Sequence, residues 1–310
     1  MVRPHEKRPA DSRAIYWGLL AASLLFGVWL NSTGFGRQLD DNAYDFFFRH
    51  YQPKPWPLTS ALLTIDEKTL QQFNGIRGER KALAAGLNLI RNAHPRAVAV
   101  DIILADTSED DEALESAFAS TRNLVLPCEL AAGNWEDPIA RFKRHATALG
   151  QVYVEPIGDA ISRYIELYKV AGEHGRADRR WVLALEAYRV SRGAQITESP
   201  HDLQVGDVII PADKEPSAFG YLPSGYAMRI RYVPASMATI PAVSIADLVA
   251  EPSRARVFTD KVVFAGVSAQ TAARDRWMTP LSDSTPMAGI EMNANAYETI
   301  ASGQFLVDAS

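Results

Sequence analysis

The chain has 310 residues, of which 32 are basic and 37 acidic, so its formal net charge is −5. No stretch rich in Lys and Arg offsets this acidity, which argues against nucleic acid as a partner. The single cysteine, Cys128, excludes an intrachain disulfide, and we expect it to pack as a small buried apolar residue.

The first predicted element is an apolar helix near the N-terminus. The 23 residues between Arg13 and Arg37 carry no charged side chain. A helix from Ala14 to Leu30 is about 26 Å long, and the six residues after it extend the apolar stretch beyond the roughly 30 Å of a bilayer core. We therefore predict a single membrane anchor over residues 14–33. The alternatives are a signal peptide cleaved near Ser32–Gly34 and a buried helix of a soluble protein.

The residues flanking this helix predict its orientation. Short basic flanks tend to remain in the cytoplasm, and aromatic residues mark the two membrane interfaces. The flank in front of the helix contains Arg3, Lys7, Arg8 and Arg13 against Glu6 and Asp11, and Trp17 and Trp29 lie near the helix ends. We expect residues 1–13 to form a cytoplasmic tail and the bulk of the chain to be exported.

Residues 37–57 form a predicted juxtamembrane segment. Leu39, Ala43, Phe46 and Phe47 have helical spacing, so the anchor helix is expected to continue toward Asp45. Three prolines between residues 53 and 57 then hold the chain extended. The dense aromatic residues of the segment are expected to dock the anchor onto the domain that follows, and the alternative is that they form a ligand cage.

Short apolar runs alternate with amphipathic segments in the first half of the exported domain, which we delimit as residues 58–306. Strands are predicted over 61–65, 97–100 and 124–126, and helices over 79–93 and 110–120. Strands joined by helices through short connections predict a parallel sheet. The expected fold class is α/β, a mostly parallel sheet covered by helices in three layers and preceded by one transmembrane helix.

The second half is less regular. Residues 196–225 are rich in Pro, Gly, Asp and Ser and are expected to form a surface excursion. The remaining expected elements are helices over 138–149, 181–191, 244–250 and 289–302 and strands over 151–154, 164–170, 228–233 and 261–265.

Four residues are candidates for a ligand site. Asp66 and Asp101 follow predicted parallel strands, and Ser268 lies in the turn after a third. Ligands of parallel α/β sheets bind beyond the carboxyl ends of the strands, and Asp275 is close enough in sequence to join them. Such a group could bind a cation or a polar ligand. The alternative is that each aspartate caps a helix or ties a loop to a backbone N–H.

No sequence motif identifies an enzyme. The six histidines show no HExxH or other ligand spacing, and neither a GxGxxG sequence nor a Walker loop is present. Ser268 lacks the flanking glycines of a nucleophile elbow. We therefore expect no catalytic residue, no metal and no cofactor. Two other functions stay open, a membrane-anchored metal-dependent hydrolase that uses the acidic residues and an anchored protein-interaction domain.

The order of several short blocks resembles the second type of CHASE domain (cyclases/histidine kinases associated sensory extracellular). The resemblance extends over about residues 38–305. Its blocks are Asp40–Asp45 with Arg49, Leu62–Asp66, Ala97–Asp101, Asp110 and Asp111 with Leu114, Lys261–Gly266, Asp275, Thr279 and Pro280, and Met287–Ala294.

The resemblance implies an input domain of a bacterial receptor in the inner membrane, which perceives an unidentified cue outside and signals to a cyclase, histidine kinase or diguanylate cyclase inside. The chain departs from the family at Gln151, where a His is usual, and at Asp159–Arg163, where the turn Gly is missing. Such receptors continue into further membrane helices, so we expect either a fragment or a sensor without its own output. We also expect a homodimer, with the small residues Gly18, Ala22 and Ser23 on the contact face.

Overall fold

The computed structural model describes residues 12–31, 33–51, 54–152, 159–171, 178–199, 202–211, 226–272 and 275–306. The chain divides into two compact units, the N-terminal unit Met1–Gln52 and the C-terminal unit Pro53–Ser310.

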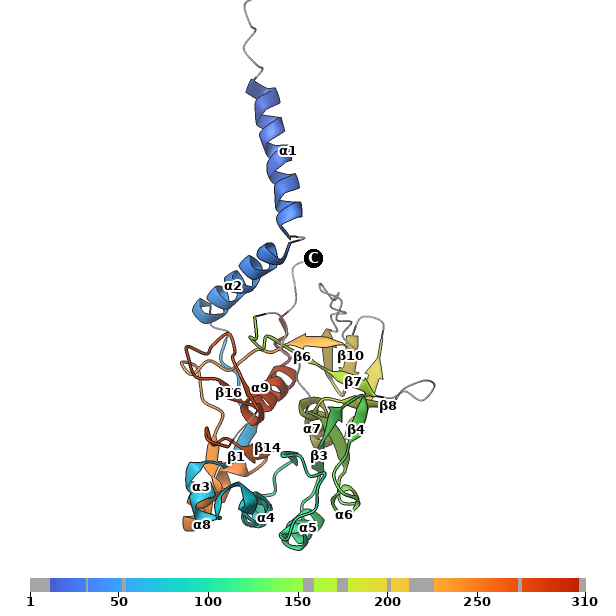
Figure 1. Cartoon of the computed structure of the whole chain (residues 1–310), viewed down its shortest axis with the longest axis vertical. Helices are drawn as coiled ribbons and strands as arrows, with labels where there is room; N and C mark the ends of the chain where they lie inside the picture. Colours follow the sequence, from blue (N-terminus) through green and yellow to red (C-terminus); the bar gives the residue numbers. More distant parts are fainter. Residues whose placement is uncertain are drawn as a thin grey trace, which may run out of the picture. The chain divides into compact units, whose positions relative to one another are not determined.

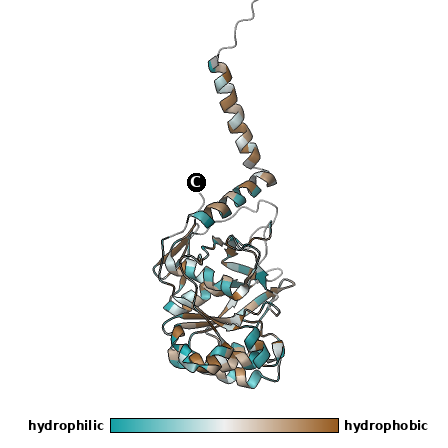
Figure 2. Ribbon diagram, turned by 90° about the vertical axis from the view of Figure 1, so that its left-hand side faces the viewer, coloured by the Kyte–Doolittle hydropathy of each residue, from teal (hydrophilic) through white to brown (hydrophobic). Residues whose placement is uncertain are grey.

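The described residues of the N-terminal unit form two helices. Helix α1 (Ser12–Asn31) is predominantly hydrophobic along its length (Figure 2), and its stretch Arg13–Leu30 has a mean hydropathy of 1.5 with none of it buried. Within the described residues, α1 is the one helix that is long and apolar enough to cross a membrane. A helix that is apolar all round and unburied has no water-soluble face, which is typical of a membrane span.

Helix α2 (Gly34–His50) starts anew and does not continue α1, contrary to the expectation of one helix reaching Asp45. Thr33 adopts an extended conformation, and its hydroxyl accepts a hydrogen bond from Gly36 N at 3.1 Å, which is the geometry of an N-cap. The expected apolar face of α2 is present, and its Phe46 and Phe47 are about half exposed, at 55% and 54%.

The C-terminal unit is built on a sheet whose strands occur in the order β13-β1-β14-β2-β3-β4, with β5 also paired to β3. All pairs are parallel except β3 with β4. The strands are β1 (Ser60–Ile65), β2 (Ala97–Asp101), β3 (Leu124–Ala131), β4 (Asn134–Glu136), β5 (Ala148–Gln151), β13 (Ala242–Ser244) and β14 (Val262–Val267).

Helices cover both faces of this sheet (Figure 1). One layer contains α3 (Glu67–Gln72), α4 (Glu79–Ile90), α5 (Asp111–Ala119) and α8 (Ile245–Ala250), and the other contains α7 (Leu183–Arg192) and α9 (Gly289–Ser302). The three-layer α/β fold with a mostly parallel sheet is therefore confirmed.

Side chains of the central strands β1 and β14 pack against helices on both faces of the sheet. Ala61, Leu63 and Ile65 belong to the cluster packed under α4, with Leu83 and Leu87 of that helix. On the opposite face, Phe264 of β14 lies with its ring centroid 5.7 Å from that of Tyr297 in α9. Because successive strand side chains point to opposite faces, an all-apolar strand is required where both faces are covered.

A buried carboxylate ties the start of β1 to α9. Glu298 is fully buried, and its Oε1 accepts hydrogen bonds from Thr59 N at 2.8 Å, Ser60 N at 2.6 Å and Ser60 Oγ at 2.6 Å. These bonds satisfy backbone groups at the start of the strand that would otherwise be buried without partners. The residues that lead into the sheet are thus fastened to the last helix.

Two expectations around residue 127 are wrong. The third strand, expected over 124–126, continues through Pro127 to Ala131. Its pairing with β2 ends at Val125, so the N–H that proline lacks is not needed for a hydrogen bond to β2. The helix expected over 138–149 is reduced to the short α6 (Ala140–Lys143), and the strand β5 follows it.

Beside the main sheet, the described residues form four small antiparallel sheets. The strand expected over 164–170 is interrupted at Leu167, and the one expected over 228–233 is only three residues long. The excursion expected over 196–225 holds three paired strands, while residues 212–225 lie outside the described residues. The strands are β6 (Tyr164–Glu166) with β12 (Ala227–Arg229), β7 (Tyr168–Ala171) with β8 (Asp178–Trp181), β9 (Ile196–Glu198), β10 (Asp202–Val205) and β11 (Val208–Pro211), and β15 (Arg276–Trp277) with β16 (Met287–Ala288).

Candidate functional site

The carboxyl ends of β13, β1, β14 and β2 lie along one edge of the sheet, which we call the carboxyl edge. Ser244 ends β13, Asp66 follows β1, Ser268 follows β14 and Asp101 ends β2. The parallel direction of these strands brings polar residues from distant parts of the sequence to the same edge. This is where ligands bind in open α/β sheets.

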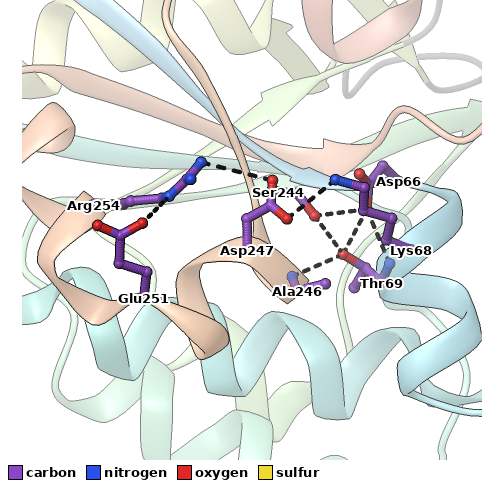
Figure 3. Close-up of polar contacts among 8 residues, drawn as sticks. All are labelled: Asp66, Lys68, Thr69, Ser244, Ala246, Asp247, Glu251 and Arg254. Carbon is purple, nitrogen blue, oxygen red and sulfur yellow. Dashed lines mark hydrogen bonds and ion pairs between the residues drawn. The ribbon is translucent and has the colours of Figure 1, made fainter.

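Asp66 is engaged in a local network at this edge (Figure 3). Its Oδ1 accepts hydrogen bonds from Thr69 N at 2.9 Å, Thr69 Oγ1 at 2.8 Å and Ser244 Oγ at 2.7 Å. Burial opposes ionisation, but these bonds together outweigh it and hold the pKa of the Asp66 carboxyl below its usual value. The carboxylate caps helix α3 and joins it to the end of β13.

Replacing Asp66 with alanine is expected to lower the free energy of unfolding by about 1–2 kcal/mol, because α3 loses its N-cap and two hydroxyl donors lose their acceptor. Urea denaturation of the full chain in detergent, followed by circular dichroism, measures this loss. Lys68→Ala is the matched control, because its exposed ion pair with Asp247 at 3.2 Å contributes little. Equal losses in the two variants would contradict the capping role.

Asp101 and Asp275 form an acidic pair beside the start of helix α9. Asp101 Oδ2 accepts a hydrogen bond from Asn293 Nδ2 at 3.1 Å. The carboxylate of Asp275 lies against Gly289, where an added Cβ would come within 2.5 Å of Asp275 Oδ2. At Gly266, an added Cβ would meet the Asp101 backbone oxygen at 3.0 Å. Two glycines therefore make room for the two acids.

The pair resists full ionisation. Burial and, to a smaller extent, the negative charge of Asp275 raise the pKa of Asp101 to about 7, and the hydrogen bond from Asn293 opposes them only in part. Burial also raises the pKa of Asp275. A carboxyl that titrates near neutral pH can hold a proton, accept a hydrogen bond from a ligand or pair with a cationic group.

Ser268 takes part in the carboxyl edge through its backbone. Its N–H donates to Ile65 O at 3.0 Å, and its carbonyl accepts from Arg276 Nη2 at 2.7 Å. Of the four candidate residues, the structure thus associates Asp101 with Asp275, while Asp66 is occupied with Thr69 and Ser244. The binding role of all four remains a prediction.

Sequence reasoning missed Asn293 and Ser244 as members of this edge. Asn293 lies in a predicted helix, and only its burial on the face toward the sheet reveals that its amide serves Asp101. Ser244 was assigned to the start of a helix and instead ends the unpredicted strand β13. A polar residue on an otherwise apolar helix face was the one available signal for Asn293.

An open depression of about 880 Å³ also lies at the carboxyl edge. Its described lining comes from Glu67, Leu70 and Gln71 of α3, the turn Asn74–Ile76, and Thr271 and Ala272. None of the four candidate residues belongs to that lining. In the described part of the chain, no three His, Cys, Asp or Glu side chains come close enough together to hold a metal ion.

Comparison with known proteins identifies the family. The model of the CHASE2 domain family matches residues 20–309, nearly the whole chain, which confirms the resemblance carried by the sequence blocks. No curated protein and no solved structure matches the chain. The chain belongs to the CHASE2 domain family, whose members are extracellular sensory domains of receptors and not themselves catalytic.

Proposed function

We propose that this chain is the sensory input of a bacterial transmembrane receptor, in which α1 crosses the inner membrane and the C-terminal unit faces the periplasm. The observation that carries the proposal is α1, an apolar helix with none of its span buried, which precedes a unit from an extracellular sensory family. The basic flank in front of α1 supports a cytoplasmic N-terminus. A cytoplasmic cyclase, histidine kinase or diguanylate cyclase would receive the signal.

Cysteine labelling tests this topology. The native Cys128 is an internal blank, because it is buried and burial raises the pKa of its thiol to about 12. A membrane-impermeant maleimide is expected to label Ser116→Cys, at an exposed position on α5, in cells with a permeabilised outer membrane. Ala10→Cys should react only after the inner membrane is lysed. The reverse pattern, or release of the chain by carbonate, would overturn the proposal.

The carboxyl edge is the part of the sensor that we propose meets the cue. Asp101 and Asp275 supply two acceptors of adjustable charge, with Asp66 and Ser268 on neighbouring strand ends. This arrangement suits a ligand that carries hydrogen-bond donors or a positive charge. Signalling through a homodimer with paired α1 helices would carry the change across the membrane.

Disulfide cross-linking tests the homodimer. Single cysteines placed along residues 18–30 of α1 are expected to cross-link with a helical period, strongest near Gly18 and Ala22 because small residues allow close helix approach. Uniform or absent cross-linking at all positions would favour a monomer.

A second candidate function, an anchored protein-interaction domain, is favoured by one observation. Phe46, Phe47 and Tyr51 of the juxtamembrane segment are exposed at 55%, 54% and 72%. A photoreactive amino acid at Phe46 would form a discrete protein adduct in cells if this face binds a partner protein, and adducts with lipid alone would count against that function.

A further inference from the structure

A cavity of about 780 Å³ opens at the amino edge of the sheet, the edge opposite the carboxyl edge, where β2 and β3 begin. Its lining comes from the end of α4 with the turn η2 (Arg91–Ala93), from the loops before β2 and β3, and from the last residues of α7. It shares no residue with the acidic pair at the carboxyl edge.

The lining is strongly cationic. It includes Arg91, Arg96, Arg122 and Arg192, together with His94, and no Asp or Glu occurs among the described lining residues. All four arginines are exposed, and within the described part of the chain none of them forms an ion pair. The C-terminal unit, from Pro53 onward, holds 26 basic and 32 acidic residues, so an acidic unit concentrates positive charge in this cavity.

Only some of these arginines are needed to offset the negative ends of helices that lie at the cavity. Three helices, α4 with η2, α5 and α7, end at the cavity, and each C-terminus carries roughly −0.5 elementary charge. Arg91 and Arg192 lie in last turns and compensate these dipoles. Arg96 and Arg122 lie in the loops before β2 and β3, beyond any helix, and leave a clear excess of positive charge.

Backbone hydrogen bonds hold these two loops in place. Arg96 N donates to Lys261 O at 2.8 Å, and Arg96 O accepts from Asn123 Nδ2 at 2.7 Å. The neighbouring Asn123 O accepts from Val98 N at 3.1 Å. The backbone that carries Arg96 and Arg122 is therefore set before any ligand arrives, and a preorganised site loses less free energy on binding.

We propose that this cavity binds a small molecule with two or more oxyanion groups, such as phosphates or carboxylates. The guanidinium fork matches both groups in bidentate geometry, and the cavity lies within the roughly 300–1,000 Å³ range of small-molecule sites, larger than one phosphate needs. The site goes beyond the proposed function, because it gives the sensor a second, oppositely charged recognition site at the edge where the chain enters β1.

Isothermal titration calorimetry of the full chain in phosphatidylcholine nanodiscs tests the proposal, with pyrophosphate and citrate as probes. At least one of them is expected to bind about tenfold or more tightly than inorganic phosphate or acetate, because several arginines act at once, and binding should weaken as NaCl is raised from ~50 to ~300 mM. Binding of neither probe, or equal binding of the single anions, would overturn the proposal.

The variant Arg96→Gln/Arg122→Gln is expected to weaken probe binding about tenfold or more. The matched control, Arg77→Gln/Lys81→Gln, removes the same charge from exposed positions outside the cavity and should leave binding unchanged. Thermal unfolding without probe verifies that both variants fold. If the first variant is unstable, Arg91→Gln replaces it with the same expectation, and unchanged binding in a folded cavity variant would refute the site.

Discussion

Replacing Asp111 with alanine is expected to lower the free energy of unfolding by about 3–5 kcal/mol. Asp111 Oδ1 forms an ion pair with Arg80 Nη1, and the two side chains are only 3% and 8% exposed. Asp111 Oδ2 also accepts from Ser108 N at 3.0 Å, and the Arg80 guanidinium lies 5.8 Å from the centre of the Phe142 ring. Removing the carboxylate leaves a buried arginine without its counter-charge between α4 and α5.

Urea denaturation of the full chain in detergent measures this change. Glu112→Ala is the matched control, because it removes the next acidic residue of the same helical turn from an exposed position and should alter stability by less than about 0.5 kcal/mol. The double variant Arg80→Met/Asp111→Leu should recover much of the loss, since it removes both buried charges. A loss below about 1 kcal/mol in Asp111→Ala would contradict the buried pair.

The parts of the fold that could be predicted were those with a strong local pattern. The runs at 61–65 and 97–100 are short, apolar and rich in Leu or β-branched residues, and this pattern predicted the strands β1 and β2, which are buried between the helix layers. Strand β13 was missed because three residues at a sheet edge carry no period, and it is stabilised only by pairing with β1. The strand expected over 151–154 begins earlier, as β5 (Ala148–Gln151), because pairing with β3 makes these residues a strand; residues 153–154 lie outside the described residues.

The acidic pair and the arginine cavity likewise depend on contacts between residues far apart in the sequence. Asp66 and Asp101 could be named because each follows a predicted parallel strand, but their partners could not. Asn293 reaches Asp101 across 192 positions of the sequence. The arginines of the cavity come from separate helix ends and loops between positions 91 and 192. No local pattern encodes such convergence, because it arises from the order of strands in the sheet.

Replacing Asp101 with asparagine is expected to stabilise the protein at pH 8 and to weaken the dependence of its stability on pH between about 4 and 7. The pKa of Asp101 is about 7 in the fold against an ordinary value of 3.8. Between these values, the folded protein holds a proton that the unfolded chain releases, so rising pH favours unfolding. At 1.36 kcal/mol for each pKa unit, the gain at pH 8 is at most roughly 4 kcal/mol.

Thermal unfolding of the full chain at a series of pH values, compared between wild type and Asp101→Asn, isolates this one group from all others that titrate. The difference in stability should be smallest below about pH 3, where Asp101 is protonated in both states, and should reach its full size above about pH 7. Asp106→Asn, which removes the same charge from an exposed position after β2, is the matched control. Both variants keep Asp275. Its repulsion of a charged residue 101 is therefore removed in Asp101→Asn and retained in Asp106→Asn. If Asp101→Asn instead parallels the wild type at all pH values, the acidic pair is solvated as ordinary surface carboxylates are, and its suitability for sensing a proton or a cation disappears with it.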